Sequence, residues 1–108
     1  MTNWHEPPSL EEEVVAAADV ELAERRVAQA RERAAHAGLS AARSFEESAR
    51  YHEQFAKVQD RAVERGASEA GVHRSSATRH RQAAADDRDL AERKRKESEA
   101  DLSLDTNQ

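Results

Sequence analysis

Cysteine and isoleucine are absent from this chain of 108 residues, and tryptophan, tyrosine and phenylalanine together supply only four residues. The absence of cysteine excludes disulfide bonds and thiol chemistry. No run of about 18 apolar residues occurs, so we expect no transmembrane helix. The opening residues, MTNWHEPPSL, lack the basic start and the apolar stretch of a signal peptide. Together these absences predict a cytoplasmic protein.

Bulky apolar residues are also scarce, because leucine, valine and phenylalanine together number 15. Such a content combined with a high net charge is typical of disordered chains, but the formal net charge here is only −5. Alanine, glutamate, lysine, leucine and arginine instead make up 60 of the 108 residues, and these are strong helix formers. The composition predicts long helices, packed closely through alanine or completed by a second chain. A chain that stays disordered until a partner binds is the remaining alternative.

A long heptad pattern follows the expected start of the first helix. Ser9 with Glu12 three residues later predicts a capping box, so this helix should begin near Leu10. Beyond it, two sets of positions at seven-residue spacing contain no charged residue, which predicts a helix-packing seam of mostly small side chains. The first set is Val20, Val27, Ala34, Ala41, Ser48, Phe55 and Ala62, and the second is Ala16, Ala23, Ala30, Ala37, Ser44, Tyr51 and Val58.

Two segments that contain glycine predict breaks in the helical pattern. Gly38, followed by Leu39 and Ser40, has the pattern of a helix stop and a new cap, which favours a hairpin. The seam stays in phase across this glycine, so the alternative is one continuous rod of roughly 80 Å. The second break is expected in the sequence ERGASEAGV, around Gly66. We predict a flexible tail at residues 1–8, one helical domain at residues 9–101 with helices near 10–37, 40–65 and 68–100, and a frayed tail at residues 102–108.

The histidines of the last predicted helix lie on its least charged face, which makes His73 and His80 candidate packing residues. They are seven residues apart, about 10.5 Å along a helix, so a single metal ion with bonds near 2 Å does not reach both. No histidine pair has the three- or four-residue spacing of a helical chelate. We therefore predict no metal site. The expected role is half-buried packing, and a pH-sensitive contact is the alternative.

The same predicted helix carries a basic face. Residues 72–96 contain eight basic and four acidic residues, whereas residues 1–24 contain seven acidic residues and no lysine or arginine. Pairing between these regions, within one chain or between two, explains the asymmetry without a ligand. The basic region has no aromatic residue for base stacking, so nucleic-acid binding is the second hypothesis. Its candidate contacts are Arg74, Arg79, Arg81, Arg88, Arg93, Lys94, Arg95 and Lys96.

Nothing in the sequence indicates catalysis or a cofactor. Tyr51, His52 and Glu53 are consecutive, and neighbouring residues on a helix point about 100° apart, so these groups do not converge. Signature motifs of nucleotide-binding loops, serine hydrolases and zinc proteases are missing. The bulky apolar face of a membrane-surface helix is missing as well. We predict no enzyme activity, no cofactor, no small-molecule substrate and no membrane contact.

The few aromatic residues have two interpretations each. Phe45, Tyr51 and Phe55 are expected to form the best-packed layer of the helices, with anchoring of a partner helix as the alternative. Trp4, in the predicted tail, either folds back onto the end of the helices or docks into another protein.

Two phrases, ARYHEQFAKVQDRAVERG and HRSSATRHRQAAADDRDLAERKR, resemble those of short actinobacterial proteins rich in alanine, arginine and histidine. In those proteins the phrase H-R-x-A-A-x-x-D-R-x-x-A-E recurs, and the run from His80 to Glu92 is similar to it. The resemblance covers about half of the chain. It implies a helical fold and a GC-rich source, and it assigns no functional residue.

We therefore expect an all-α protein of two or three long helices, folded as an antiparallel hairpin or three-helix bundle with a coiled-coil-like, alanine-rich seam. Its expected role is a structural or regulatory protein–protein interaction, with a second copy or another helical protein as the partner. The residues expected along the interaction seam are Val20, Val27, Ala34, Ala41, Phe45, Tyr51, Phe55, Val58, His73, His80 and Leu90.

Overall fold

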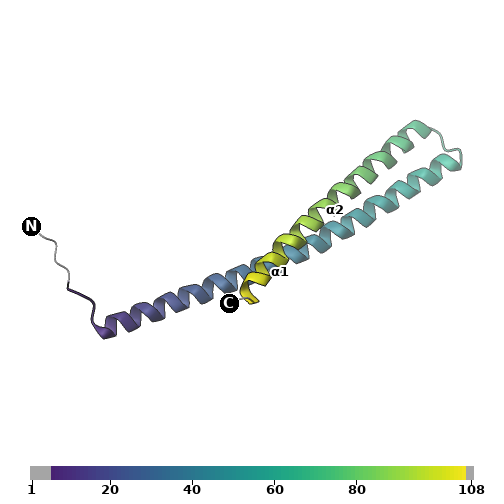
Figure 1. Ribbon diagram of the computed structural model, residues 1–108. Helices are drawn as coiled ribbons and strands as arrows, with labels where there is room; N and C mark the ends of the chain where they lie inside the picture. The colour runs from purple at the N-terminus through teal and green to yellow at the C-terminus, as the bar shows by residue number, and fades with distance from the viewer. Residues whose placement is uncertain (1–5, 107–108) are drawn as a thin grey trace, which may run out of the picture.

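The computed structural model describes residues 6–106, which form two long α-helices joined by a short turn (Figure 1). Helix α1 spans Leu10–Glu64 and helix α2 spans Ala70–Thr106, and no strand occurs among the described residues. Helix α2 folds back along the last two thirds of α1, while the first third of α1 extends beyond it (Figure 1). The molecule is thus an elongated hairpin with extents of 89 × 34 × 15 Å.

The start of α1 is fixed by the side chains that cap it. The Ser9 hydroxyl accepts a hydrogen bond from the backbone N–H of Glu12 at 3.2 Å, and the Glu12 carboxylate accepts one from the backbone N–H of Ser9 at 3.4 Å. Glu11 and Glu13 add negative charge to the first turn, at the positive end of the helix dipole. The predicted capping box is therefore confirmed.

The helix break predicted at Gly38 is wrong, because α1 continues through it as a single helix of 55 residues. A Cβ atom at Gly38 would overlap the hydroxyl of Ser98 in α2. This glycine is therefore explained by the close approach of the two helices rather than by a helix stop. The chain reverses once instead, after Glu64, where Gly66 and Glu69 adopt φ angles of 76° and 61°. With a single reversal there are two helices, so the predicted three-helix bundle is also wrong.

The two helices pack through small side chains that recur at seven-residue intervals. Each alanine contributes one side-chain carbon, so the helix axes approach closely while little apolar surface is buried per residue. No leucine, valine or phenylalanine of the described chain is fully buried. The buried residues are Ala35, Ala42, Ala49 and Ala56 in α1 and Ala77, Ala84, Ala91 and Ser98 in α2.

The buried line of α1 lies one residue after the first set of predicted seam positions, as Ala35 follows Ala34 and Ala42 follows Ala41. One residue corresponds to a rotation of about 100° around an α-helix. The predicted seam therefore lies beside the contact with α2 rather than on it, and most of its bulky members are exposed. The fully buried contact of α1 with α2 is thus the line beside the predicted seam, while Phe55, His73 and His80 of the predicted set contact the other helix at its edge. As a surface for another chain the predicted seam stays a prediction.

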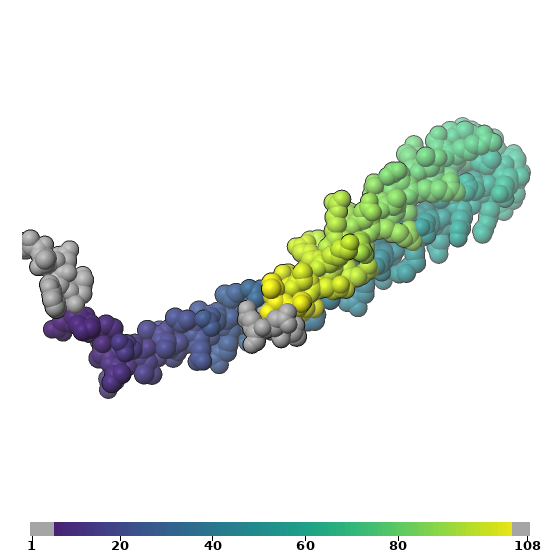
Figure 2. Space-filling model, viewed as in Figure 1, coloured from purple at the N-terminus to yellow at the C-terminus, as the bar shows by residue number. Residues whose placement is uncertain are grey.

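The first part of α1 has no neighbour. We call residues 10–27 the arm and residues 28–106 the hairpin. Every described residue from Glu6 to Val27 is exposed, and Ala28 is the first described residue that is partly covered. The space-filling view shows the arm as a single helix that leaves the thicker hairpin (Figure 2). About a third of α1 thus lies in solvent on all sides.

The ends of the helical region differ from the predicted tails. Residues 1–5, which include Trp4, lie outside the described residues, and residues 6–9 are not helical. Helix α2 continues to Thr106, beyond the end expected near residue 100, so the predicted frayed tail is helical as far as it is described. Over the described residues, neither helix contains a segment long and apolar enough to span a membrane.

Candidate interaction surface

Three ion pairs fix the antiparallel register of the hairpin on one side. Each pair lies seven residues further along α1 than the one before it, and seven residues further back along α2. Their side chains are roughly one third to one half exposed, so each pair contributes at most about 1 kcal/mol. All three pairs form together only in this register, so as a set they select it. The pairs are Glu46 with Arg95, Glu53 with Arg88 and Asp60 with Arg81.

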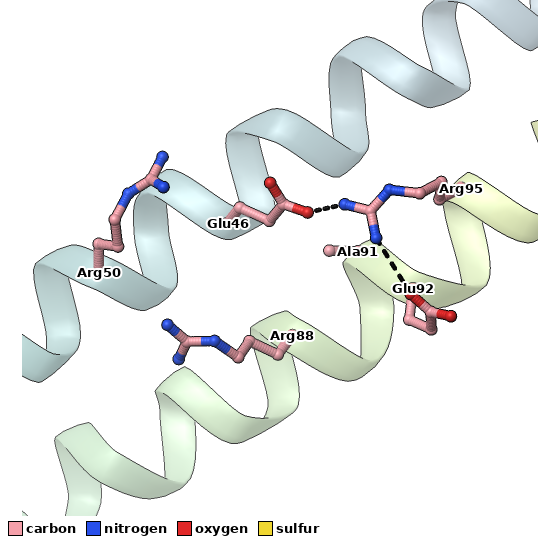
Figure 3. Close-up of a pocket in the computed structure, with 6 residues that line it drawn as sticks. All are labelled: Glu46, Arg50, Arg88, Ala91, Glu92 and Arg95. Atoms are coloured by element: carbon pink, nitrogen blue, oxygen red, sulfur yellow. Dashed lines mark hydrogen bonds and ion pairs between the residues drawn. The ribbon is translucent and has the colours of Figure 1, made fainter.

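The depression shown in Figure 3 belongs to this set of ion pairs. Arg95 of α2 reaches across to Glu46 of α1 and also contacts Glu92, one turn earlier in its own helix, at 3.0 Å. The remaining lining residues are Arg50, Arg88 and Ala91. A small-molecule site is normally concave and mostly apolar, with few polar groups. This depression is lined mainly by charged side chains, so we assign it to helix pairing.

Histidines occupy the opposite side of the buried line. The Nδ1 atoms of His52 and His80 are 2.8 Å apart, so one ring donates a hydrogen bond and the other accepts it. The ring of His80 also stacks on Phe55, with centroids 5.2 Å apart and an interplanar angle of 25°. His73 hydrogen-bonds to Gln59. Both histidines singled out in the sequence therefore contact α1.

No metal site accompanies the histidines. The carboxylate of Asp87 lies 3.9 Å from Nε2 of His52, and one of its oxygens is buried without a hydrogen-bond partner in the described chain. Among the described residues, no group of three or more histidine, aspartate, glutamate or cysteine side chains is arranged to hold a metal ion. The contacts of His52 with His80 and of His73 with Gln59 join α1 to α2.

The basic face proposed for nucleic-acid binding is divided by the fold. Arg81, Arg88 and Arg95 are the three arginines of the ion pairs with α1. Lys94 and Lys96 pair with glutamates of their own helix, at 3.8 and 3.5 Å. The members of the predicted set that are exposed and form no ion pair within the described chain are Arg74, Arg79 and Arg93.

The outer face of α1 carries a continuous uncharged stripe. It consists of the two sets of seam positions and runs through both the arm and the hairpin. We call it the outer seam. Tyr51 and Phe55 contact each other, with ring centroids 4.8 Å apart, yet they remain 59% and 39% exposed. Val20, Val27 and Val58 are each more than half exposed.

The other seam candidates are placed differently. Phe45 and Ala41 are partly buried beside α2, and Ala34 is exposed. Leu90 of α2 is 39% exposed. Ala34 and Ala41 belong to the outer seam, whereas Phe45 and Leu90 lie outside it.

The ion pairs between the helices were not predicted, although the spacing of charged residues in the sequence indicates them. Acidic residues recur every seven positions at Glu46, Glu53 and Asp60, and arginines recur with the same spacing in α2. The contact of Gly38 with Ser98 was not predicted either, because 60 residues separate the two and no local pattern links them.

The surface area of the whole chain is large because the molecule is elongated. The structure exposes 8675 Å², whereas a compact monomer of 12.0 kDa exposes about 6,000 Å².

No family model matches the chain, and no curated protein or solved structure matches it either. The candidate surface is therefore defined by the exposure and spacing of its residues.

Proposed function

We propose that this chain is a helical protein–protein interaction module that self-associates through the outer seam of α1. The observation that supports this proposal is the exposure of the bulky seam residues, above all Val20, Val27, Tyr51 and Val58, along one face of one helix. Residues at three- and four-residue spacing that avoid charge are typical of a surface that packs on another helix.

The energetics of the arm also favour a partner. Most helix stability in proteins comes from tertiary packing of an amphipathic face rather than from intrinsic propensity. The arm has 18 residues and no tertiary contact from within the described chain. The surface in excess of a compact monomer is roughly 2,700 Å², more than the roughly 1,600 Å² that a standard interface buries in total. A second helix on the outer seam supplies the missing burial.

Sedimentation velocity over a wide concentration range tests this function. We expect the unmodified chain to form a dimer or higher oligomer, and the double variant Val20→Ser, Val27→Ser to shift the association at least about tenfold towards monomer. Burial of a valine is worth roughly 1.5–3 kcal/mol, which is enough for that shift.

The matched control is Val14→Ser, Val15→Ser. It removes two exposed valines from the same arm, outside the outer seam, and should leave the association unchanged. A monomer at all concentrations would refute the proposal. Tight binding to a DNA or RNA duplex that weakens steeply with salt would favour the nucleic-acid hypothesis, since phosphate binding depends strongly on salt.

A further inference from the structure

Two parts of the outer seam expose bulky apolar side chains, and they lie at opposite ends of α1. One is the arm, with Val20 and Val27. The other is the cluster of Tyr51, Phe55 and Val58 on the hairpin. We propose that two copies of this chain pair antiparallel, so that the arm of each copy packs on the hairpin of the other along the outer seam of α1. This inference rests on the self-association proposed above and specifies its partner and geometry.

The antiparallel register follows from the sizes of the seam residues. In antiparallel helix pairs each layer joins one residue from either seam set. Placing Val20 opposite Val58 of the second copy brings Val27 opposite Tyr51 and Ala23 opposite Phe55. Every exposed bulky residue of the seam then has an apolar partner, and the ring of Phe55 faces a small side chain. Near the centre, around Leu39, the layers contain only alanine and serine, which allows the two α1 helices to approach closely.

Charged residues that flank the seam support the same register. Asp19 comes opposite Arg61 of the second copy, and Arg33 comes opposite Glu47. All four are exposed, and none forms an ion pair within the part of the chain that the structure describes. The wider charge distribution agrees, since residues 6–24 carry seven acidic and no basic residues, whereas residues 50–96 carry twelve basic and eight acidic ones. Opposite charges across an interface favour one arrangement over others.

Other arrangements of the same seam fit less well. A shift of one heptad in one direction places Arg26 opposite Arg61, and a shift in the other direction places Glu13 in the seam against Val58. A parallel pair sets Asp19 beside Glu24 and Arg26 beside Arg31. Like charges in such positions disfavour a pairing. Pairing of the two arms alone leaves Tyr51 exposed.

The arrangement also closes on itself. The two copies use the same surface and run in opposite directions. The arm of each copy therefore packs on the hairpin of the other. Such a two-fold interface forms a dimer and leaves no free seam for a third copy. The overlap extends from Ala16 to Ala62, almost the full length of α1. A dimer is therefore the expected end state.

Cysteine crosslinking tests this register directly, because the natural chain contains no cysteine. In the double variant Val20→Cys, Val58→Cys, the two sulfurs of one chain are 38 residues apart on a straight helix, about 57 Å, so only a second copy brings them together. Under mild oxidation we expect a covalent dimer on a denaturing gel. Circular dichroism of the reduced variant should show unchanged helix content.

Two further double variants report the competing registers. Val20→Cys with Tyr51→Cys crosslinks efficiently only if the pair is shifted by one heptad, and Ala16→Cys with Val27→Cys only if the two arms pair with each other. We expect both to crosslink at least about tenfold more slowly, because correct placement of the reacting groups governs the rate. Faster crosslinking of either variant in a chain that self-associates would overturn the register and leave the proposed function intact. A chain that remains monomeric would overturn both.

Discussion

In the hairpin, residues 28–106, all the fully buried side chains except Ser98 are alanines, whereas in the arm, residues 10–27, leucines and valines are exposed along the whole length. The hairpin adds cross-helix ion pairs and histidine contacts to its alanine line. The arm has only its own backbone hydrogen bonds and the cap at Ser9.

This contrast separates two uses of apolar residues on one helix. Within the chain, small side chains set a short distance between helices, and charged pairs select the register. The larger side chains, Val20 and Tyr51 among them, lie on the neighbouring face, which α2 does not cover. The alanine line of α1 ends at the boundary between hairpin and arm. Seven residues before Ala28 its next position is the charged Glu21, whereas the outer seam remains uncharged in the arm.

The largest expected difference between the two regions is in amide hydrogen exchange. In dilute monomeric protein, arm amides should exchange at least about a hundredfold faster than amides near Ala49, because local opening of an unpacked helix costs little. Mass spectrometry of exchanged peptides measures this. Raising the protein concentration should slow exchange in the arm if the proposed dimer forms. Equal protection of both regions in dilute protein would contradict the comparison.

Next in size is the effect of a larger side chain in the alanine line. Ala49→Leu should lower the free energy of unfolding by about 1–3 kcal/mol, because Ala49 is 0% exposed and no space exists for three more carbons. Urea unfolding followed by circular dichroism measures it. Ala18→Leu, an exposed position of the arm outside the seam, should change stability by no more than about 0.5 kcal/mol. Similar values for both variants would mean that the alanine line is not tightly packed.

A smaller effect is expected where the helices approach most closely. Gly38→Ala gains about 1 kcal/mol of helix propensity, but the new Cβ meets the Ser98 hydroxyl, which should remove most of the gain. In a Ser98→Ala background that hydroxyl is gone, and the gain should return. Thermal or urea unfolding of the four proteins gives the coupling energy. Strict additivity would show that the two residues do not touch.

The smallest effect is expected from the cross-helix ion pairs. Glu53→Gln removes the partner of Arg88 and should lower stability by about 0.2–1 kcal/mol, since both side chains are nearly half exposed. The loss should shrink in 1 M salt, where the screening length is about 3 Å. Glu21→Gln, on the arm, is the control and should have no comparable effect. A loss that persists in high salt would indicate packing rather than charge as its cause.

Parts of this fold could be predicted from the sequence because their signals are local. The cap at Ser9, the helix start at Leu10 and the reversal around Gly66 all lie within a few residues of their causes. The all-helical class followed from composition. The role of Gly38 could not be predicted, since a helix stop and a close approach use the same residue, and Ser98 decides between them from another helix.

The orientation of α1 was misjudged for a related reason. Two uncharged lines run side by side along this helix, and the line with the larger residues is the more conspicuous one. Burial in the hairpin instead follows the line through Ala42 and Ala56. A sequence pattern indicates the most hydrophobic face of a helix as its packing face. Helix α2 instead packs on the face of α1 that allows both close contact of the helices and the ion pairs of Glu53 and Asp60.

The alanine line also determines how the hairpin responds to temperature. The heat capacity change of unfolding arises mainly from newly hydrated apolar surface and is typically about 12–15 cal/mol/K per residue. A hairpin whose buried side chains are methyl groups hydrates little new apolar surface when it opens. Its heat capacity change should therefore lie below that range, its stability curve should be flat, and its unfolding should extend over a broad interval of temperature.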